Sequence, residues 1–370
     1  MSERVENQTG IRDSSKPDGS VTAGGNGRGM LKLAFRAACV GLTALVLYAC
    51  VFLAAFCLLP PLYQDSYQSV VVRQYDSLKE IQEPKVIVLG TSYVTFSVDA
   101  DLMEQKLGMP CQIFGCHLGM GTRYFFDMSE EWIGEGDIVV YPIWEADMNY
   151  YGTELILTGI EGRMDLLLSL PPGAVKGVLA GSRDIITKKL YEPLRRGLFP
   201  GERERADSGV DPIYTIDSFD EKGTMKALRQ ESWTEPVPEE QKKRYDTAAY
   251  SQEYIAFLNE FDAFCRERGA VFCLTYPTIL DEAVENSEEE LEAFDRWLRE
   301  QVTAPVITDI RDTLMPKEEI YNGVMHCNTP GAEHYTSMLA EDIKREIFDK
   351  SYVSFEPDTA GASCSEGSYR

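Results

Sequence analysis

Ser92 is the residue of this chain best placed to act as a nucleophile. It directly follows the apolar run 85–89 and the pair Gly90-Thr91. A serine hydroxyl is inert at neutral pH unless a positioned base, most often histidine, accepts its proton. The same stretch also fits a simpler interpretation, a buried strand that ends in ordinary turn residues. A catalytic serine is therefore a hypothesis that depends on the histidines.

Three histidines are available, and they differ in predicted position. His334 falls inside the predicted last helix, which favours a surface or packing role. His117 follows the second predicted strand in a glycine-rich loop, where it could contact substrate. His326 lies in the loop before the last helix, and that loop reaches the same edge of the sheet as Ser92. We therefore predict His326 as the base.

Acyl transfer also needs hydrogen-bond donors for the oxyanion that develops in the transition state. The backbone N–H of Ser92 is one expected donor. The N–H of Gly115, at the exit of the neighbouring strand, is the second, because glycine lets the backbone approach closely. The spacing Gly115-x-x-x-Gly119-x-Gly121 does not follow the dinucleotide fingerprint, and no cofactor is expected.

Short apolar runs alternate with helical patterns and would position these residues. The runs cover residues 85–90, 111–114, 138–143, 270–275 and 305–308. A continuous apolar run of this length is typical of a buried parallel strand. The alternation predicts a right-handed, five-stranded parallel α/β sheet.

Local signals also mark the helices between these strands. Asp99 is expected to cap a helix that ends near Gly108, and Ser287 opens a capping box for a helix to Gln301. Thr329 is expected to cap the last helix, with Pro330 in its first turn. Two more helices are predicted from helical spacing, over about 122–132 and within the amphipathic stretch 247–268.

The predicted α/β domain, residues 85–352, contains an insertion over 149–245. The insertion is expected to be partly helical and to cover the active face. Its basic stretch could bind an anionic polymer or form a solvated helix face; the stretch comprises Lys188, Lys189, Arg195, Arg196, Arg203 and Arg205. A polar connector, residues 62–84, precedes the domain, and a disordered tail, 353–370, follows it.

Residues 37–59 run without a charge and are long enough to cross a hydrocarbon core of roughly 30 Å. The alternative is a buried core helix, and no convincing signal-peptide cleavage site is present. Residues 1–36 are expected to be a disordered cytoplasmic N-terminus. Because three basic residues precede the span, the positive-inside tendency puts residues 62–370 outside the membrane; these are Arg28, Lys32 and Arg36.

The composition argues against several functions. The net charge is −24, and residues 1–36 carry +2, so the remainder carries −26. A domain with this much negative charge is a poor partner for nucleic acid, because phosphates require a basic surface. The nine cysteines show no Cys-x-x-Cys spacing, which argues against a disulfide framework, and three histidines predict no metal cluster.

The motifs resemble the SGNH/GDSL hydrolase superfamily. Gly90-Thr91-Ser92, Gly115 and His326 look like its blocks I, II and V. Residues 111–140 and 321–331 resemble most the membrane-anchored SGNH proteins of Gram-positive bacteria. The similarity leaves out the insertion.

This resemblance implies a flavodoxin-like three-layer sandwich with a five-stranded parallel sheet and a Ser92–His326 catalytic pair. Relatives of this kind O-acetylate or D-alanylate cell-wall polymers and exopolysaccharides, commonly beside a membrane-bound O-acyltransferase. The serine would take an acyl group, acetyl or similar, and pass it to a sugar hydroxyl or to water. A carbohydrate esterase and a non-catalytic scaffold for the acyltransferase or the polysaccharide are the alternatives.

The chain departs from the family pattern at three places. The family aspartate four residues before the histidine is Asn322 here, although Glu318 or Glu319 could substitute. The block II asparagine is replaced by Ile113. The block III asparagine is also missing, and we expect Glu145 at that place to act on substrate instead.

Overall fold

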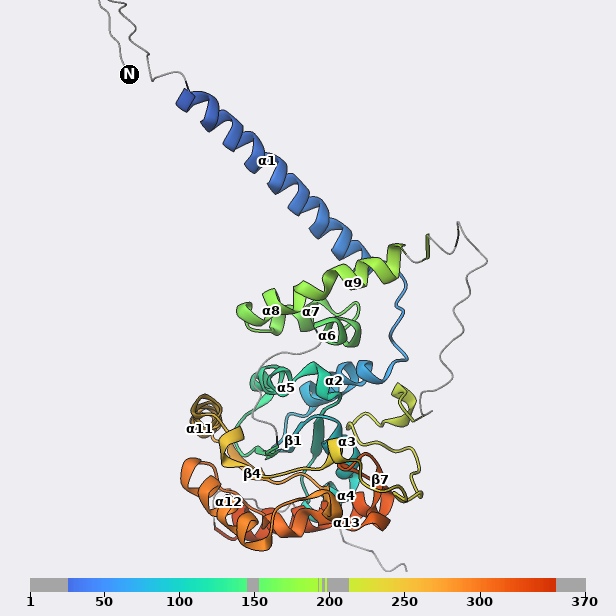
Figure 1. Ribbon diagram of the computed structural model, residues 1–370, viewed down its shortest axis with the longest axis vertical. Helices are drawn as coiled ribbons and strands as arrows, with labels where there is room; N and C mark the ends of the chain where they lie inside the picture. Colours follow the sequence, from blue (N-terminus) through green and yellow to red (C-terminus); the bar gives the residue numbers. More distant parts are fainter. Residues whose placement is uncertain (1–25, 145–152, 192, 195–196, 198–212, 351–370) are drawn as a thin grey trace, which may run out of the picture. The chain divides into compact units, whose positions relative to one another are not determined.

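The computed structural model describes residues 26–144, 153–191, 193–194, 197 and 213–350 (Figure 1). The chain divides into two units, Met1–Val51 and Phe52–Arg370. The predicted tail 353–370 and most of the predicted disordered N-terminus lie outside the described residues. The fold is α/β, with a four-stranded parallel sheet and one apolar N-terminal helix.

The apolar helix contains most of the predicted span. Helix α1 covers Asn26–Leu53 and continues in a π-helical turn, Ala54–Leu58. Gly29–Leu58 is long and apolar enough to cross a membrane, and only 17% of its most apolar window is buried. The helix is apolar all round, which is typical of a lipid-facing segment rather than of a surface helix. It is therefore a candidate single-pass anchor.

The parallel sheet is built from four short strands, all of them almost fully buried. They are β1 (Val86–Gly90), β2 (Cys111–Gly115), β3 (Ile138–Pro142) and β4 (Val271–Thr275), in the order β2-β1-β3-β4. Helices α2 and α5 lie on one face and helices α4 and α13 on the other (Figure 1). This double cover explains why the strands are continuously apolar instead of alternating.

The predicted fifth strand is reduced to one bridge, so a five-stranded flavodoxin-like sandwich is not confirmed. Val306 pairs in parallel with Leu274, through a bond from Leu274 N to Pro305 O and another from Ile307 N to Leu274 O. Pro305 has no N–H to extend the ladder. Asp309 then caps the turn Ile310–Thr313, which ends the extended segment.

Most predicted helix boundaries are confirmed by their caps. Helix α4 covers Ala100–Leu107; Asp99 accepts from Leu102 N, and Gly108 ends the helix with φ 72°. Helix α12 covers Glu288–Gln301 and has the predicted capping box at Ser287. Helix α5 (Thr122–Ser129) continues in a short 3-10 turn, and α11 (Gln252–Glu267) occupies the amphipathic stretch.

The cap of the last helix was predicted one residue too late. Helix α13 covers Thr329–Ile343, and its N-cap is Asn328, whose side chain accepts from Gly331 N. An asparagine side chain caps at least as well as threonine. Pro330 lies in the first turn as predicted.

The expected connector is a folded part of the domain. Helix α2 (Val70–Glu80) buries Val70, Val71, Gln74, Tyr75 and Leu78 and packs against β2. A 3-10 turn, Tyr67–Ser69, precedes it. The stretch looked polar because only one face of the helix is buried.

The described part of the insertion is partly helical, as predicted. It contains α6 (Thr153–Gly159), α7 (Met164–Ser169), α8 (Pro172–Val178), α9 (Ser182–Ile186) and a π-helical turn, Thr187–Tyr191. In the basic stretch, Lys188 pairs with Glu154, and the buried Lys189 pairs with Glu161 at 2.5 Å. These two lysines therefore serve the fold rather than an anionic polymer; the four arginines lie outside the described residues.

Candidate active site

Ser92 occupies the first position of a helix that starts where β1 ends. Helix α3 covers Ser92–Ser97, and the buried Thr91 precedes it. A Cβ on Gly90 would lie 2.6 Å from Val94 Cγ1, so the tight turn into the helix needs glycine there. The Ser92 N–H is one of the helix donors without an intrahelical acceptor. The serine therefore sits at the carboxyl edge of the sheet with a donor beside it.

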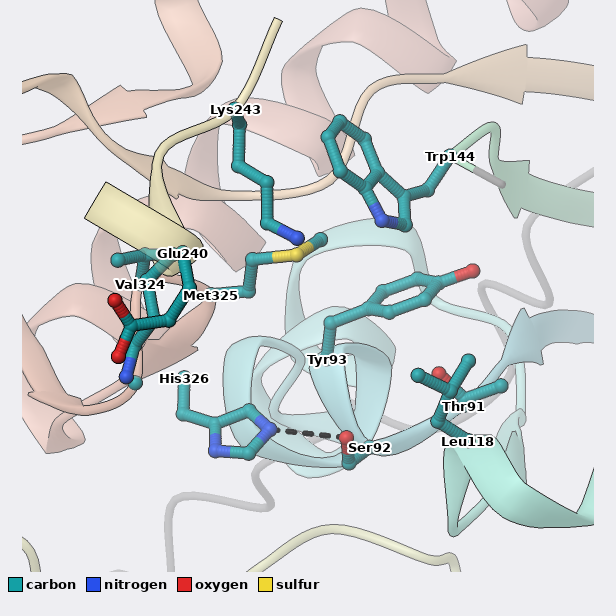
Figure 2. Close-up of a pocket in the computed structure, with 12 residues that line it drawn as sticks. Thr91, Ser92, Tyr93, Leu118, Trp144, Glu240, Lys243, Val324, Met325 and His326 are labelled. Atoms are coloured by element: carbon teal, nitrogen blue, oxygen red, sulfur yellow. Dashed lines mark hydrogen bonds between the residues drawn. The ribbon is translucent and has the colours of Figure 1, made fainter. Parts of the chain in front are cut away.

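His326 is within hydrogen-bond distance of Ser92, although 234 residues separate them. Its Nε2 lies 2.9 Å from Ser92 Oγ (Figure 2). The predicted loop is here a short hairpin of β7 (Ile320–Asn322) and β8 (His326–Cys327), turned at Gly323 with φ 59°. This hairpin of β7 and β8 puts the histidine at the same edge as the serine.

A further short strand pair, β5 (Ile279–Leu280) with β6 (Leu314–Met315), is parallel.

Asn322 completes a chain of hydrogen bonds behind the histidine. Its Oδ1 lies 2.8 Å from His326 Nδ1, and its Nδ2 donates to the Tyr214 hydroxyl at 3.2 Å. The Tyr214 hydroxyl also lies 3.4 Å from Asn322 Oδ1. Because an amide oxygen only accepts, the proton of a neutral His326 belongs on Nδ1. Nε2 is then free to accept the proton of Ser92.

The two glutamates that could have replaced the family aspartate do not contact His326. The carboxylate of Glu319 lies 2.7 Å from His334 Nδ1 on the surface of α13. Glu318 contributes its backbone carbonyl to Asn328 Nδ2. Among the described residues, His326 forms hydrogen bonds only with Ser92 and Asn322.

A buried cation lies next to the histidine. Arg229 is only 2% exposed and donates to the carbonyls of Phe96 and Cys327, both at 3.1 Å. Its guanidinium lies 5.1 Å from the Phe96 ring, which stacks on the His326 ring at 4.1 Å. Burial, then the charge of Arg229, lowers the pKa of His326 to about 4. The His326 imidazole is therefore neutral over a wide pH range.

The predicted second oxyanion donor has another partner. The N–H of Gly115 donates to Gln74 Oε1 at 3.3 Å, and Gln74 Nε2 donates back to Gly115 O at 2.8 Å. The side chain of Gln74 is fully buried in α2. The Gly115 N–H is thus directed into the interior rather than at Ser92. This contact could not be predicted from the sequence, because Gln74 belongs to the stretch expected to be a connector.

Gly115 has a packing role instead. A Cβ there would lie 2.7 Å from Gly90 O, where β2 pairs with β1. We expect Gly115→Ala to lower the free energy of unfolding by about 2–3 kcal/mol. Thermal unfolding would measure this, with Gly134→Ala as control because no atom lies within 4 Å of its Cβ. A Gly115→Ala variant as stable as the wild type would contradict this role.

Of the predicted substrate residues, the structure brings one to the site. His117 lines a cavity together with Ser92 and His326, and its Nδ1 accepts from Gly119 N at 2.8 Å. The proton of the neutral ring is therefore on Nε2. Glu145 lies outside the described residues. His334 is on the surface of α13, as expected.

Two cavities adjoin at Ser92 and His326. The first has a volume of about 300 Å³ and the second about 520 Å³. Sequence reasoning missed several of their wall residues, including Tyr67, Trp144, Tyr214 and Lys243, since these come from the predicted connector and from in or near the insertion. Leu155 of α6 and Tyr214, both from the predicted insertion, line the second cavity.

No group of three or more His, Cys, Asp or Glu residues in the described part of the chain could hold a metal ion. The eight described cysteines are all free. No family model and no curated protein matches this chain.

Proposed function

We propose that this protein is a membrane-anchored SGNH-type serine acyltransferase or esterase that acts on acyl esters of a cell-envelope or exopolysaccharide carbohydrate. One observation carries the proposal: the hydrogen-bond chain from Ser92 through His326 to Asn322 opens directly onto two cavities. Nucleophile, base and orienting group then stand in the order that acyl transfer needs. The SGNH resemblance of the surrounding motifs adds the envelope carbohydrate as substrate class.

Each residue has a defined role in the proposed reaction. Ser92 Oγ attacks the carbonyl carbon of the acyl ester while His326 Nε2 takes the serine proton. The Ser92 N–H donates to the oxyanion. When the tetrahedral intermediate collapses, the ester C–O bond breaks and His326 returns the proton to the leaving alcohol. A sugar hydroxyl or water then gives its proton to His326 and attacks the acyl-serine, which releases Ser92.

The anchor defines the proposed location. If Gly29–Leu58 spans the membrane with its basic end inside, the α/β domain is extracytoplasmic. An acyl group would then have to cross the membrane, which a membrane-bound O-acyltransferase could accomplish as a partner. Transfer to a sugar and hydrolysis use the same residues, so a carbohydrate deacylase is the closest alternative.

A catalytically degenerate scaffold is the second candidate, and Asn322 is the observation that favours it. A neutral amide does not stabilise an imidazolium by charge, and Asp→Asn in a serine protease triad lowers turnover by roughly 10⁴. In that case, however, the loss follows from the wrong tautomer. Here the amide oxygen faces His326, which holds the productive tautomer.

A serine-directed fluorophosphonate probe on the full chain in phospholipid nanodiscs tests the proposal. We expect labelling of the wild type, loss of labelling in Ser92→Ala, and retention in Ser232→Ala, an exposed serine outside both cavities. Labelling that persists in Ser92→Ala would rule out this nucleophile. A wild type that neither reacts with the probe nor hydrolyses any ester would establish the scaffold instead.

A further inference from the structure

The two cavities share the reacting residues but have different walls. Both are lined by Ser92, Leu118 and His326. The remaining wall of the first comes from residues 91, 93, 144, 240, 241, 243 and 323–325. That of the second comes from residues 66–68, 117, 155 and 214. Ser92 Oγ therefore lies where two separately built spaces meet.

The wall of the larger cavity is mostly apolar, and its polar groups besides Ser92 and His326 come from Ser66, Gln68 and His117. Tyr67 and Tyr214 meet edge to face at 5.3 Å, and Leu118 and Leu155 complete its apolar surface. No Asp, Glu, Lys or Arg is among the described residues that line it. Such a lining suits a hydrocarbon chain, since burying it costs no charge desolvation.

The wall of the smaller cavity is mixed. Trp144 presents an aromatic ring, and the Lys243 ammonium lies 5.4 Å from its centroid. Glu240 adds a carboxylate (Figure 2). Gln241 also lines this cavity and adds an amide. An aromatic face with polar groups around it suits a carbohydrate, which has apolar C–H faces and hydroxyl edges.

We infer that the larger cavity binds the acyl chain and the smaller one the alcohol, and that the acyl chain is a linear one several carbons longer than acetyl. The inference rests on the proposed function. At the tetrahedral carbon on Ser92, the acyl chain and the alcohol extend in different directions, and each needs its own space. An acetyl group has one methyl beyond the carbonyl, which would leave most of a cavity of about 520 Å³ unused.

Chain-length preference tests the inference. The full chain in nanodiscs is assayed with p-nitrophenyl esters from acetyl to decanoyl, with Ser92→Ala as background. Each methylene that leaves water adds roughly fourfold to transition-state binding. We expect kcat/KM for the hexanoyl ester to exceed that for the acetyl ester by at least about 10-fold.

Two matched variants test whether the larger cavity determines the chain-length preference. Leu155→Trp narrows the larger cavity and should lower the hexanoyl-to-acetyl ratio about 10-fold. Leu168→Trp, at a leucine that is 70% exposed on α7 and lines neither cavity, should leave the ratio unchanged. A wild type that prefers acetyl, or a ratio unaffected by Leu155→Trp, overturns the inference while Ser92 labelling still supports the proposed function. Absence of both labelling and Ser92-dependent hydrolysis overturns both.

Discussion

Replacement of Tyr214 by phenylalanine is expected to lower kcat/KM of a Ser92-dependent ester reaction by about 10²-fold. This loss is smaller than the roughly 10⁴-fold loss of turnover that a wrong histidine tautomer causes in a serine protease. The Tyr214 hydroxyl accepts from Nδ2 of Asn322 at 3.2 Å and lies 3.4 Å from Oδ1 of the same amide. Because the hydroxyl lies beside both ends of the amide, it holds the amide in place with Oδ1 beside His326 Nδ1. Tyr214 is therefore a positioning residue.

The loss has a specific physical reason. Without the hydroxyl, the Asn322 amide can turn so that its NH₂ group faces His326 Nδ1. Nδ1 must then accept, and the proton of the neutral ring moves to Nε2. Such a ring cannot accept the proton of Ser92, so the fraction of productive enzyme falls.

The Asn322→Asp background tests whether Tyr214 acts by orienting the amide or only by packing. A carboxylate has no donor end and stabilises the imidazolium, so Asn322→Asp alone should raise kcat/KM. In that background Tyr214→Phe should cost less than about 3-fold. If Tyr214 only packs against Tyr67 and Phe96, its loss would cost the same in both backgrounds.

The contact between Ser92 and His326 could be predicted from the sequence because it depends on topology. Parallel strands place their exits at one edge, so a serine after the first strand and a histidine before the last helix converge there. Asn322 could be predicted from the family pattern, because it lies four residues before His326. The hairpin that turns at Gly323 then places the two residues opposite each other. These placements need only local rules and strand order.

The supporting residues could not be predicted in this way. Tyr214 and Arg229 lie in the insertion, about 100 residues from the partners that give them a role. Gln74 lies in the predicted connector, and its bond to Gly115 removes a donor that the strand pattern had suggested. Side-chain contacts between irregular segments leave no periodic signal. The prediction of a full fifth strand was wrong for a related reason. Val306 is apolar and pairs with Leu274, but Pro305 and Asp309 limit the pairing to one bridge.

The second large effect concerns pH. The base must be neutral to accept the proton of Ser92, so activity is lost as pH falls through the pKa of His326. Burial and Arg229 lower that pKa to about 4. The acid limb of the kcat/KM profile should therefore lie near pH 4 rather than near the ordinary value of about 6.5. At pH 5 the enzyme should keep about nine tenths of its plateau activity, where an ordinary histidine would keep about 3%.

Asn322→Asp should move this limb to higher pH, because a carboxylate beside Nδ1 favours the imidazolium and raises the pKa of His326. We expect a shift of at least about one pH unit together with a higher plateau. Arg229→Lys keeps the buried charge, so the acid limb of this variant should stay near pH 4, as in the wild type. Thermal unfolding checks that the variant is folded. A profile of kcat/KM from pH 3.5 to 8 measures all three. A wild-type limb at pH 6 or above would show that neither burial nor Arg229 controls the base, since both act to keep the imidazole neutral.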